Sequence, residues 1–187
     1  MIIAVLGRAG SGKTTVSAIL AARLGCEYID ISKVVEEVST LSKGKQGRKA
    51  LQKVHLKQED PDWLATPLIE RAQASLQVDE PRRLCIVTGI REPYLLYRLQ
   101  EIDEALVFSI KVNPYMRYCR LCTRDGFISV DDFQISDNGD KLLGLDITFE
   151  STHRVIDGEQ ALENVINDIE VVLFQHGVRS HRKLGEF

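Results

Sequence analysis

Apolar residues along this chain follow two patterns that alternate with each other. Short uninterrupted apolar runs are typical of strands buried on both faces, whereas apolar residues repeating every three or four positions are typical of helices. Five runs predict strands, at residues 2–6, 27–30, 84–88, 105–112 and 155–156. Because strands and helices alternate, the sequence predicts an α/β fold with a five-stranded parallel sheet flanked by helices.

Glycine and proline mark the ends of several predicted helices. Gly25 is placed to end the first helix. Three further helices begin where proline takes the first helical position, at Asp60-Pro61, Glu92-Pro93 and Asn113-Pro114. Residues 161–173 carry one clear apolar stripe. Residues 125–152 lack a long periodic run, so we expect a flap there, and we expect the polar residues 177–187 to form a flexible tail.

The composition is that of a soluble globular protein, with 44% apolar and 27% charged residues. A length of 187 residues favours one domain. The cysteine pattern does not suggest a disulfide framework. No apolar run reaches the roughly 7–15 residues of a secretory signal or the roughly 20 of a membrane span. We therefore expect an intracellular, cytoplasmic protein without a membrane partner. The net charge of −3 gives no general basic field, so nucleic acid is not an expected partner.

The strongest motif is GRAGSGKT at residues 7–14, which fits G-x-x-x-x-G-K-[ST] between a predicted strand and a predicted helix. Its glycines let backbone N–H groups point into an anion-sized hollow at a helix N-terminus. Lys13 would supply a charge for the β- and γ-phosphates, and the Thr14 hydroxyl would ligate Mg²⁺. The motif predicts ATP, with Mg²⁺ as cofactor, bound by Gly7, Arg8, Ala9, Gly10, Ser11, Gly12, Lys13, Thr14 and Thr15.

Other classes of phosphate-loop protein lack support in the sequence. Neither the D-x-x-G nor the N-K-x-D string of GTPase switches occurs. The segment LSKGKQ at residues 41–46 is superficially similar to the L-S-G-G-Q motif of transporter ATPases. It follows the phosphate loop by only about thirty residues, which is too close for that motif.

The chain resembles the family of nucleoside monophosphate kinases and dephospho-coenzyme A kinases over about residues 1–175. Within this family it is closest to the short dephospho-coenzyme A kinase-like and phage deoxynucleotide kinase branches. Besides the phosphate loop, the resemblance is carried by GCEYID (25–30), VTGIRE (87–92), Arg117, Arg120, Arg124 and VIDG (155–158).

This resemblance implies a phosphate-loop NTPase fold with one kinase domain at 1–187, an acceptor-binding flap at 31–80 and a lid at 120–150. It implies an ATP-dependent phosphotransferase whose acceptor is a nucleoside or deoxynucleoside monophosphate, with dephospho-coenzyme A as the alternative. The sequence leaves the oligomeric state open. A catalytically weak nucleotide-binding or regulatory protein is the alternative of another class.

Two residues are implied to lie near the acceptor. Asp30, at the end of the second predicted strand, would lie between the nucleotide phosphates and the acceptor and take part in catalysis. It could equally be a helix N-cap for residues 31–42. Arg91, in the Gly-x-Arg turn, would hold the acceptor through its guanidinium fork. The alternative for Arg91 is a surface ion pair with Glu92 or Glu101.

Three arginines recur at helical spacing, so they share one helix face. The resemblance makes this face the stem of the lid, with Arg117 binding ATP and Arg120 and Arg124 stabilising the transferring phosphoryl group. The alternative is a solvated or salt-bridged face. The acids between residues 125 and 150 could pair with these arginines, but we favour caps and solubilising charge for them.

Some positions depart from the family or leave two readings open. Thr88 stands where the family often has an Asp that helps to order the metal, and it carries no charge. Asp157 stands where an Asn near the adenine is common. Residues 39–58 hold six Lys or Arg and no acid, which suits a substrate with several phosphates, a single-stranded nucleic acid end or a solvated helix surface. Cys119 and Cys122 have no further metal ligands at suitable spacing, so we expect them to pack.

Overall fold

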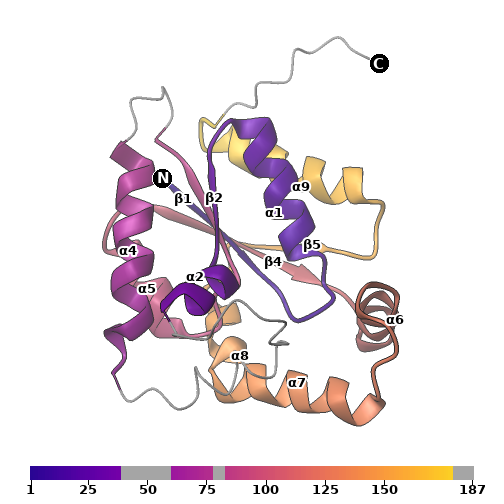
Figure 1. Ribbon diagram of the computed structural model, residues 1–187. Coiled ribbons are helices and arrows are strands. Elements are labelled where there is room, and N and C mark those ends of the chain that lie inside the picture. The colour runs from indigo at the N-terminus through magenta and orange to yellow at the C-terminus, as the bar shows by residue number, and fades with distance from the viewer. Residues whose placement is uncertain (39–59, 78–82, 179–187) are drawn as a thin grey trace.

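The fold is built on one parallel sheet, as predicted. The structure is a computed structural model of the 187-residue chain and describes residues 1–38, 60–77 and 83–178. Its five strands are β1 (Ile2–Leu6), β2 (Glu27–Asp30), β3 (Cys85–Thr88), β4 (Ala105–Lys111) and β5 (Arg154–Asp157). They lie in the order β2-β3-β1-β4-β5 and all neighbouring pairs are parallel (Figure 1). The prediction of an α/β fold with a five-stranded parallel sheet is therefore confirmed.

Helices connect the strands and cover both faces of the sheet. Their bounds are α1 (Lys13–Leu24), α2 (Ile31–Val38), α4 (Asp62–Gln77), α5 (Pro93–Gln100), α6 (Pro114–Asp125), α7 (Val130–Leu142), α8 (Leu145–Thr148), the 3₁₀ helix η1 (Phe149–Ser151) and α9 (Leu162–Gln175). Proline takes the first position of α5 and α6 as predicted, and the Asn113 side chain accepts a hydrogen bond from the Met116 N–H at 2.9 Å. Helix α4 begins one residue later than predicted, and Asp60 accepts the Asp62 N–H at 2.8 Å.

Two hydrophobic clusters lie on opposite faces of the sheet. All five residues of β1 are fully buried, and alternate residues face opposite ways. Ile3 and Val5 pack toward α1 and α9, whereas Ile2, Ala4 and Leu6 pack toward α2, α4 and α5 (Figure 1). Burial on both faces explains why β1 is an uninterrupted apolar run. The side chain of Trp63, the only tryptophan in the chain, packs at the edge of the second cluster.

The segment at residues 125–152, where the sequence shows no long periodic run, is mostly helical. It contains α7, α8 and η1, and Ser129 caps α7 by accepting the Asp132 N–H at 3.1 Å. The buried residues of α7 are Phe133, Ser136, Gly139 and Asp140. They follow helical spacing, but only one of the four is a large apolar residue. Hydrophobic periodicity therefore could not reveal this helix.

Several sequence features lie outside the described residues. They include the LSKGKQ segment, the basic stretch at 39–58 and most of the expected tail. Among the described residues, the Val178 side chain is buried against the α1–α9 cluster. Cys119 is exposed, so the packing expected of it is wrong. None of the helices in the described parts of the chain is both long and apolar enough to span a membrane.

Candidate functional site

The phosphate loop connects β1 to α1 at the carboxyl end of the sheet. Gly10 and Gly12 have φ values of 78° and 88°, a left-handed conformation that favours glycine. Gly7 also has no room for a side chain, because a Cβ there would lie 2.4 Å from the Ser11 Oγ. That Oγ is buried and lacks a hydrogen-bond partner within the structure. The loop therefore has the curled backbone that exposes N–H groups to an anion at the start of α1.

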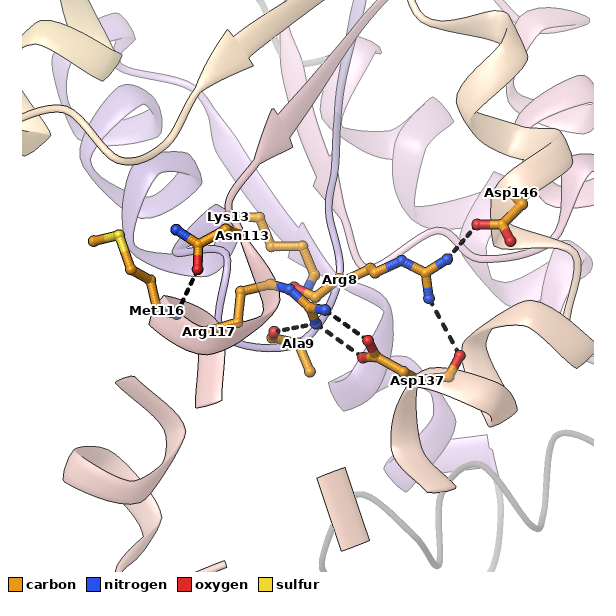
Figure 2. Close-up of polar contacts among 8 residues, drawn as sticks. All are labelled: Arg8, Ala9, Lys13, Asn113, Met116, Arg117, Asp137 and Asp146. Atoms are coloured by element: carbon orange, nitrogen blue, oxygen red, sulfur yellow. Dashed lines mark hydrogen bonds and ion pairs between the residues drawn. The ribbon is translucent and has the colours of Figure 1, made fainter. Parts of the chain in front are cut away.

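Three residues of the first turn of α1 carry the side chains expected to meet the nucleotide. Lys13 begins the helix, and its Nζ donates to the Arg8 carbonyl oxygen at 3.4 Å. Its ammonium group therefore lies over the loop itself (Figure 2). Thr14 and Thr15 are exposed in the same turn.

Arg117 anchors α6 to the phosphate loop. Its side chain is 3% exposed, and its Nη1 donates to the Ala9 carbonyl oxygen at 3.2 Å (Figure 2). The backbone of α6 also packs closely against the loop. A Cβ on Gly10 would lie 2.6 Å from the Arg117 carbonyl oxygen, so there is no room for a side chain at this position. The guanidinium also lies 5.0 Å from the ring centroid of Phe133, a cation–π distance. Residues 108 positions apart in sequence, Ala9 and Arg117, thus form one packed unit around the loop.

The other two arginines of the predicted face lie differently. The Arg120 Nη1 lies 3.5 Å from the Ser11 carbonyl oxygen, and its Nη2 donates to the Gly158 carbonyl oxygen at 2.8 Å. Arg120 thus links the phosphate loop to the turn between β5 and α9. Arg124 is 56% exposed and pairs with Asp125. The structure brings Arg117 and Arg120 to the loop and leaves Arg124 on the surface.

Acids of α7 and α8 hold the arginines of the loop region. The Asp137 carboxylate accepts from both terminal nitrogens of Arg117, at 2.8 and 2.6 Å. The Asp137 carbonyl oxygen accepts from Arg8 at 3.2 Å, and the Asp146 carboxylate pairs with the same Arg8 (Figure 2). The expectation that these acids serve as caps and solubilising charge is therefore wrong for Asp137 and Asp146.

Asp30 and Thr88 end the neighbouring strands β2 and β3 and lie opposite each other in the sheet register. One oxygen of Asp30 accepts the Ser32 N–H at 2.9 Å, which is the capping contact, and the other accepts the Tyr28 hydroxyl at 3.3 Å. Thr88 is fully buried, and its hydroxyl donates to the Val5 carbonyl oxygen at 3.0 Å. At this edge Asp30 thus presents a carboxylate, whereas the Thr88 hydroxyl donates its hydrogen bond to the backbone of β1.

Arg91 follows β3 and reaches the lid region. Its Nε donates to Asp140 at 2.8 Å, and its Nη1 donates to the Gly89 carbonyl oxygen at 3.3 Å. The Asp140 side chain is 2% exposed and the Arg91 side chain is 13% exposed. The alternative of an ion pair with Glu92 or Glu101 is therefore wrong, because the partner of Arg91 is an acid of α7. A buried pair thus joins the segment after β3 to α7.

Sequence reasoning missed the hydrogen bond from Tyr28 to Asp30 and the pairing of the α7 acids. Asp157 also has a local structural role, because its carboxylate accepts the Glu159 N–H at 2.9 Å and so holds the turn that follows β5. The signal for Tyr28 was available, since side chains two residues apart on a strand point to the same face as Asp30. No such local signal exists for Asp137 or Asp140.

The residues present fit a magnesium–nucleotide complex better than a free metal ion. Within the described ranges, no three His, Cys, Asp or Glu residues group as a metal site. Thr14 and Asp30 instead offer hard oxygen donors, at the start of α1 and at the end of β2. Mg²⁺ commonly takes one or two protein oxygens and completes its shell with phosphate oxygens and water. A bound nucleotide would therefore supply the remaining ligands.

A pocket of about 410 Å³ adjoins the loop on the β4–β5 side. Its lining includes Arg8, Lys111, Arg117 and Phe149. The volume falls within the range of about 300–1,000 Å³ that is usual for small-molecule sites. Because Arg8 and Arg117 line it, the pocket is continuous with the arginine–aspartate contacts that hold the loop.

Several solved structures with a similar fold are described as kinases. A gluconokinase from Sinorhizobium meliloti 1021 is 16% identical, covers 93% of this chain and 91% of its own, and superposes with a TM-score of 0.63. A shikimate kinase from Acinetobacter baumannii in complex with shikimate is 18% identical, covers 95% of each chain and gives 0.61. A sugar kinase from Janibacter sp. HTCC2649 is 18% identical, covers 92% of this chain and 94% of its own, and gives 0.58.

Sequence comparisons reach the level of the family. A search of curated proteins found no match to the chain. The nucleotide-kinase branch suggested by the motifs is not confirmed and stays a prediction. The model of the family described as AAA domain matches residues 3–132, a span that includes the phosphate loop, Asp30, Arg91 and the arginine face of α6. Since this span is well over half of the chain, the protein belongs to the AAA domain family.

Proposed function

We propose that this protein is an ATP-dependent phosphotransferase that transfers the γ-phosphoryl group of ATP to a small anionic acceptor. The observation that carries the proposal is the seating of α6 across the phosphate loop, with Arg117 and Arg120 on the loop carbonyls of Ala9 and Ser11. A loop that only binds nucleotide needs no second cationic element over it. Phosphoryl transfer does, because negative charge on the transferred group must be stabilised by preorganised cations.

Each residue at the loop has a distinct role in this proposal. Lys13 and the loop N–H groups hold the β- and γ-phosphates, and Thr14 ligates Mg²⁺, which supplies charge neutralisation when bound. Arg120 is the guanidinium that stabilises the transferring group, whereas Arg117 holds α6 in place. Asp30, at the carboxyl end of β2, orients the acceptor oxygen or the metal's water shell. No covalent enzyme intermediate is required, because positioning and charge supply the catalysis.

The acceptor we favour is a nucleoside or deoxynucleoside monophosphate, on the strength of the Gly-x-Arg turn that presents Arg91. A guanidinium fork suits a phosphate, and it suits a carboxylate equally well. The fold neighbours that phosphorylate gluconate and shikimate make a carboxylated polyol the second candidate acceptor. Dephospho-coenzyme A remains a third. Arg91 already lies on a carboxylate, that of Asp140, which supports an anionic group at this place.

The test is an assay of ADP release coupled to a spectrophotometric readout, with purified full-length protein and Mg·ATP. The acceptor panel contains nucleoside and deoxynucleoside monophosphates, dephospho-coenzyme A, gluconate and shikimate. We expect one acceptor class to raise ADP release far above the rate without acceptor. ATP binding with no stimulation by any acceptor would favour the alternative of a regulatory protein. That alternative is raised by Thr88, which is buried and uncharged at the position where the resembling family often has a metal-ordering Asp. Absence of ATP binding would remove the proposal altogether.

A further inference from the structure

The pocket of about 410 Å³ beside the phosphate loop has a floor that faces away from α1. Ser109 and Val155 lie opposite each other in the register of β4 and β5, and Lys111 follows two residues after Ser109. The three side chains therefore leave the sheet on the same face, and all three line the pocket. Phe108 and Ile156 leave on the other face, where α1 and α9 pack. The nucleotide, expected at the first turn of α1, thus belongs to the opposite side of these strands.

Helix α8 and the 3₁₀ helix η1 stand between the pocket and the turn that carries Arg91. Asp146 of α8 and Phe149 of η1 line the pocket. Between them in sequence, the Thr148 hydroxyl donates to the Arg91 carbonyl oxygen at 2.8 Å. One short segment therefore contacts the pocket through some of its side chains and the Arg91 turn through another. The pocket is separate from the place proposed for the acceptor.

The charged side chains of the pocket do not balance one another. Its described lining contains three cations and one acid, namely Arg8, Lys111, Arg117 and Asp146. Arg8 pairs with Asp146, and Arg117 pairs with Asp137 from outside the lining. Among the residues that the structure describes, the Lys111 ammonium belongs to no ion pair. The pocket is left with one positive charge, which a ligand with one negative charge would complement.

The rest of the lining is largely apolar and includes Pro114, Phe149 and Val155. Small-molecule sites combine such walls with a few polar groups that fix the orientation of the ligand. We propose that this pocket is an effector site for a small organic monoanion with an apolar body, such as a hydrophobic carboxylate. The anionic group lies at Lys111, and the apolar body packs against Phe149 and Val155.

Arg8 connects this pocket to the phosphate loop. Its side chain lines the pocket and reaches Asp146, whereas its carbonyl oxygen accepts from the Lys13 Nζ at 3.4 Å (Figure 2). An anion in the pocket therefore adds negative charge close to the loop that holds the phosphates of ATP. Because like charges repel, the effector weakens Mg·ATP binding, and Mg·ATP weakens effector binding by the same factor. The effector site goes beyond the proposed function, and only this coupling requires nucleotide binding.

The test compares two fluorescent probes that share one apolar body, anilinonaphthalene sulfonate and the uncharged anilinonaphthalene. Both are excited directly, and their dissociation constants are measured by titration. We expect Lys111→Gln to weaken the sulfonate about two- to fivefold, the effect of one exposed charge pair, and to leave the uncharged probe unchanged. Val155→Trp fills the pocket and should weaken both probes about tenfold or more.

Each variant has a matched control away from the pocket. Arg154→Gln removes a cation from β5 at an exposed residue that alternates with Val155, and Val171→Trp adds the same bulk on α9. Val155 and Val171 are 57% and 58% exposed, so an indole is accommodated equally at both. Neither control should change the affinity of either probe. Thermal unfolding reports whether each variant is folded, and Lys111→Gln decides the matter if Val155→Trp is not.

The coupling is measured by calorimetry of Mg·ATP binding at increasing concentrations of the sulfonate probe. We expect the dissociation constant to rise about fivefold and then to level off, as coupling between two sites requires, and Val155→Trp to abolish the rise. A rise without limit would place the probe in the nucleotide site and overturn the inference. Probe binding that is insensitive to Val155→Trp, or equal weakening of both probes by Lys111→Gln, would also overturn it. An unchanged Mg·ATP affinity with the probe bound would refute the effector role.

Failure of the proposed function would look different. Wild-type protein that does not bind Mg·ATP would remove the phosphotransferase proposal, whereas the two probes would still report on the pocket.

Discussion

At the scale of single residues, the phosphate loop makes the sharpest demand on Lys13. Its ammonium lies over the loop and contacts the Arg8 carbonyl oxygen, outside the hydrophobic core. We expect Lys13→Ala to lower turnover about 10²–10³-fold, because one preorganised charge on the transferring group is lost. The unfolding midpoint without nucleotide should stay near that of the wild type. Steady-state kinetics with the best acceptor of the panel measures the first quantity, and normal turnover would exclude the loop as the reaction site.

Arg120 and Arg124 allow a second residue-scale prediction. Both were predicted to act in catalysis, but Arg120 contacts the loop whereas Arg124 pairs with Asp125 on the surface. We expect Arg120→Ala to lower kcat by about 10³-fold or more, with little change in substrate affinity, as loss of a transition-state cation does. Arg120→Lys should restore little, since an ammonium lacks the planar fork.

Measuring kcat for Arg124→Ala in parallel shows which of the two arginines acts in catalysis. Arg154→Ala, at an exposed residue of β5, serves as the control. A kcat loss confined to the Arg124 variant would mean that α6 moves in the catalytic complex so that its last turn reaches ATP. If neither variant loses kcat, the cationic face of α6 has a structural role only.

The residue scale also shows what the sequence could and could not predict of the site. The GRAGSGKT string predicted the loop because its chemistry depends on neighbours in sequence. The ion pairs around it join residues far apart, with Arg117 20 positions from Asp137, Arg91 49 from Asp140 and Arg8 138 from Asp146. Such pairs produce no periodic pattern in the sequence. An isolated acid such as Asp137 therefore cannot be distinguished from an ordinary surface residue before the fold is known.

At the scale of elements, α6 and α7 are joined by the Arg117–Asp137 pair, and this pair is largely buried. We expect Asp137→Asn to destabilise the protein by about 3–5 kcal/mol, because the buried guanidinium of Arg117 would be left without its anion. The control is Asp125→Asn, which removes a partner from an exposed pair and should cost about 0–1 kcal/mol. Urea denaturation of both variants gives the two free energies of unfolding, and similar values would show that Asp137 is not the anchor of α7.

The contact between Arg91 and Asp140 connects β3 to α7 and gives another prediction at this scale. If Arg91 holds the anionic group of the acceptor, Arg91→Ala should weaken the acceptor by about 1.5–3 kcal/mol, the range for charged hydrogen bonds, and ATP much less. Separate KM values for the two substrates measure this. A KM increase limited to ATP would place Arg91 on the donor side.

The elements themselves were predictable to unequal degrees. The central strands were found because burial on both faces makes them largely apolar, as the five fully buried residues of β1 illustrate. Helix α9 was found because Val165, Ile166, Ile169 and Leu173 form a buried apolar stripe. Helix α7 was missed because its buried face is made of Ser136, Gly139 and Asp140 besides Phe133, and its stability comes from ion pairs with other elements.

At the scale of the whole molecule, nucleotide binding should appear as a change in global stability. A ligand at one hundred times its dissociation constant adds about 2.7 kcal/mol of stability to the folded state. For a domain of this length, that corresponds to a rise of about 5–11 °C in Tm. We expect Mg·ATP to give a rise of this order for the wild type and much less for Lys13→Ala. Differential scanning fluorimetry across ATP concentrations tests this, and an equal rise in both proteins would point to binding elsewhere.

The placement of Trp63 makes one half of the molecule visible to spectroscopy. The chain has no other tryptophan, and this indole packs beside the cluster formed with α2, α4 and α5, on the sheet face opposite α1. Excitation at the red edge of the tryptophan band, where tyrosine does not absorb, therefore reports on that half alone. ATP, which is expected at α1, should leave the emission nearly unchanged, whereas an acceptor that repacks α2 against α4 should shift it. The two substrates can thus be followed separately in one unlabelled sample, and their order of binding read from stopped-flow traces.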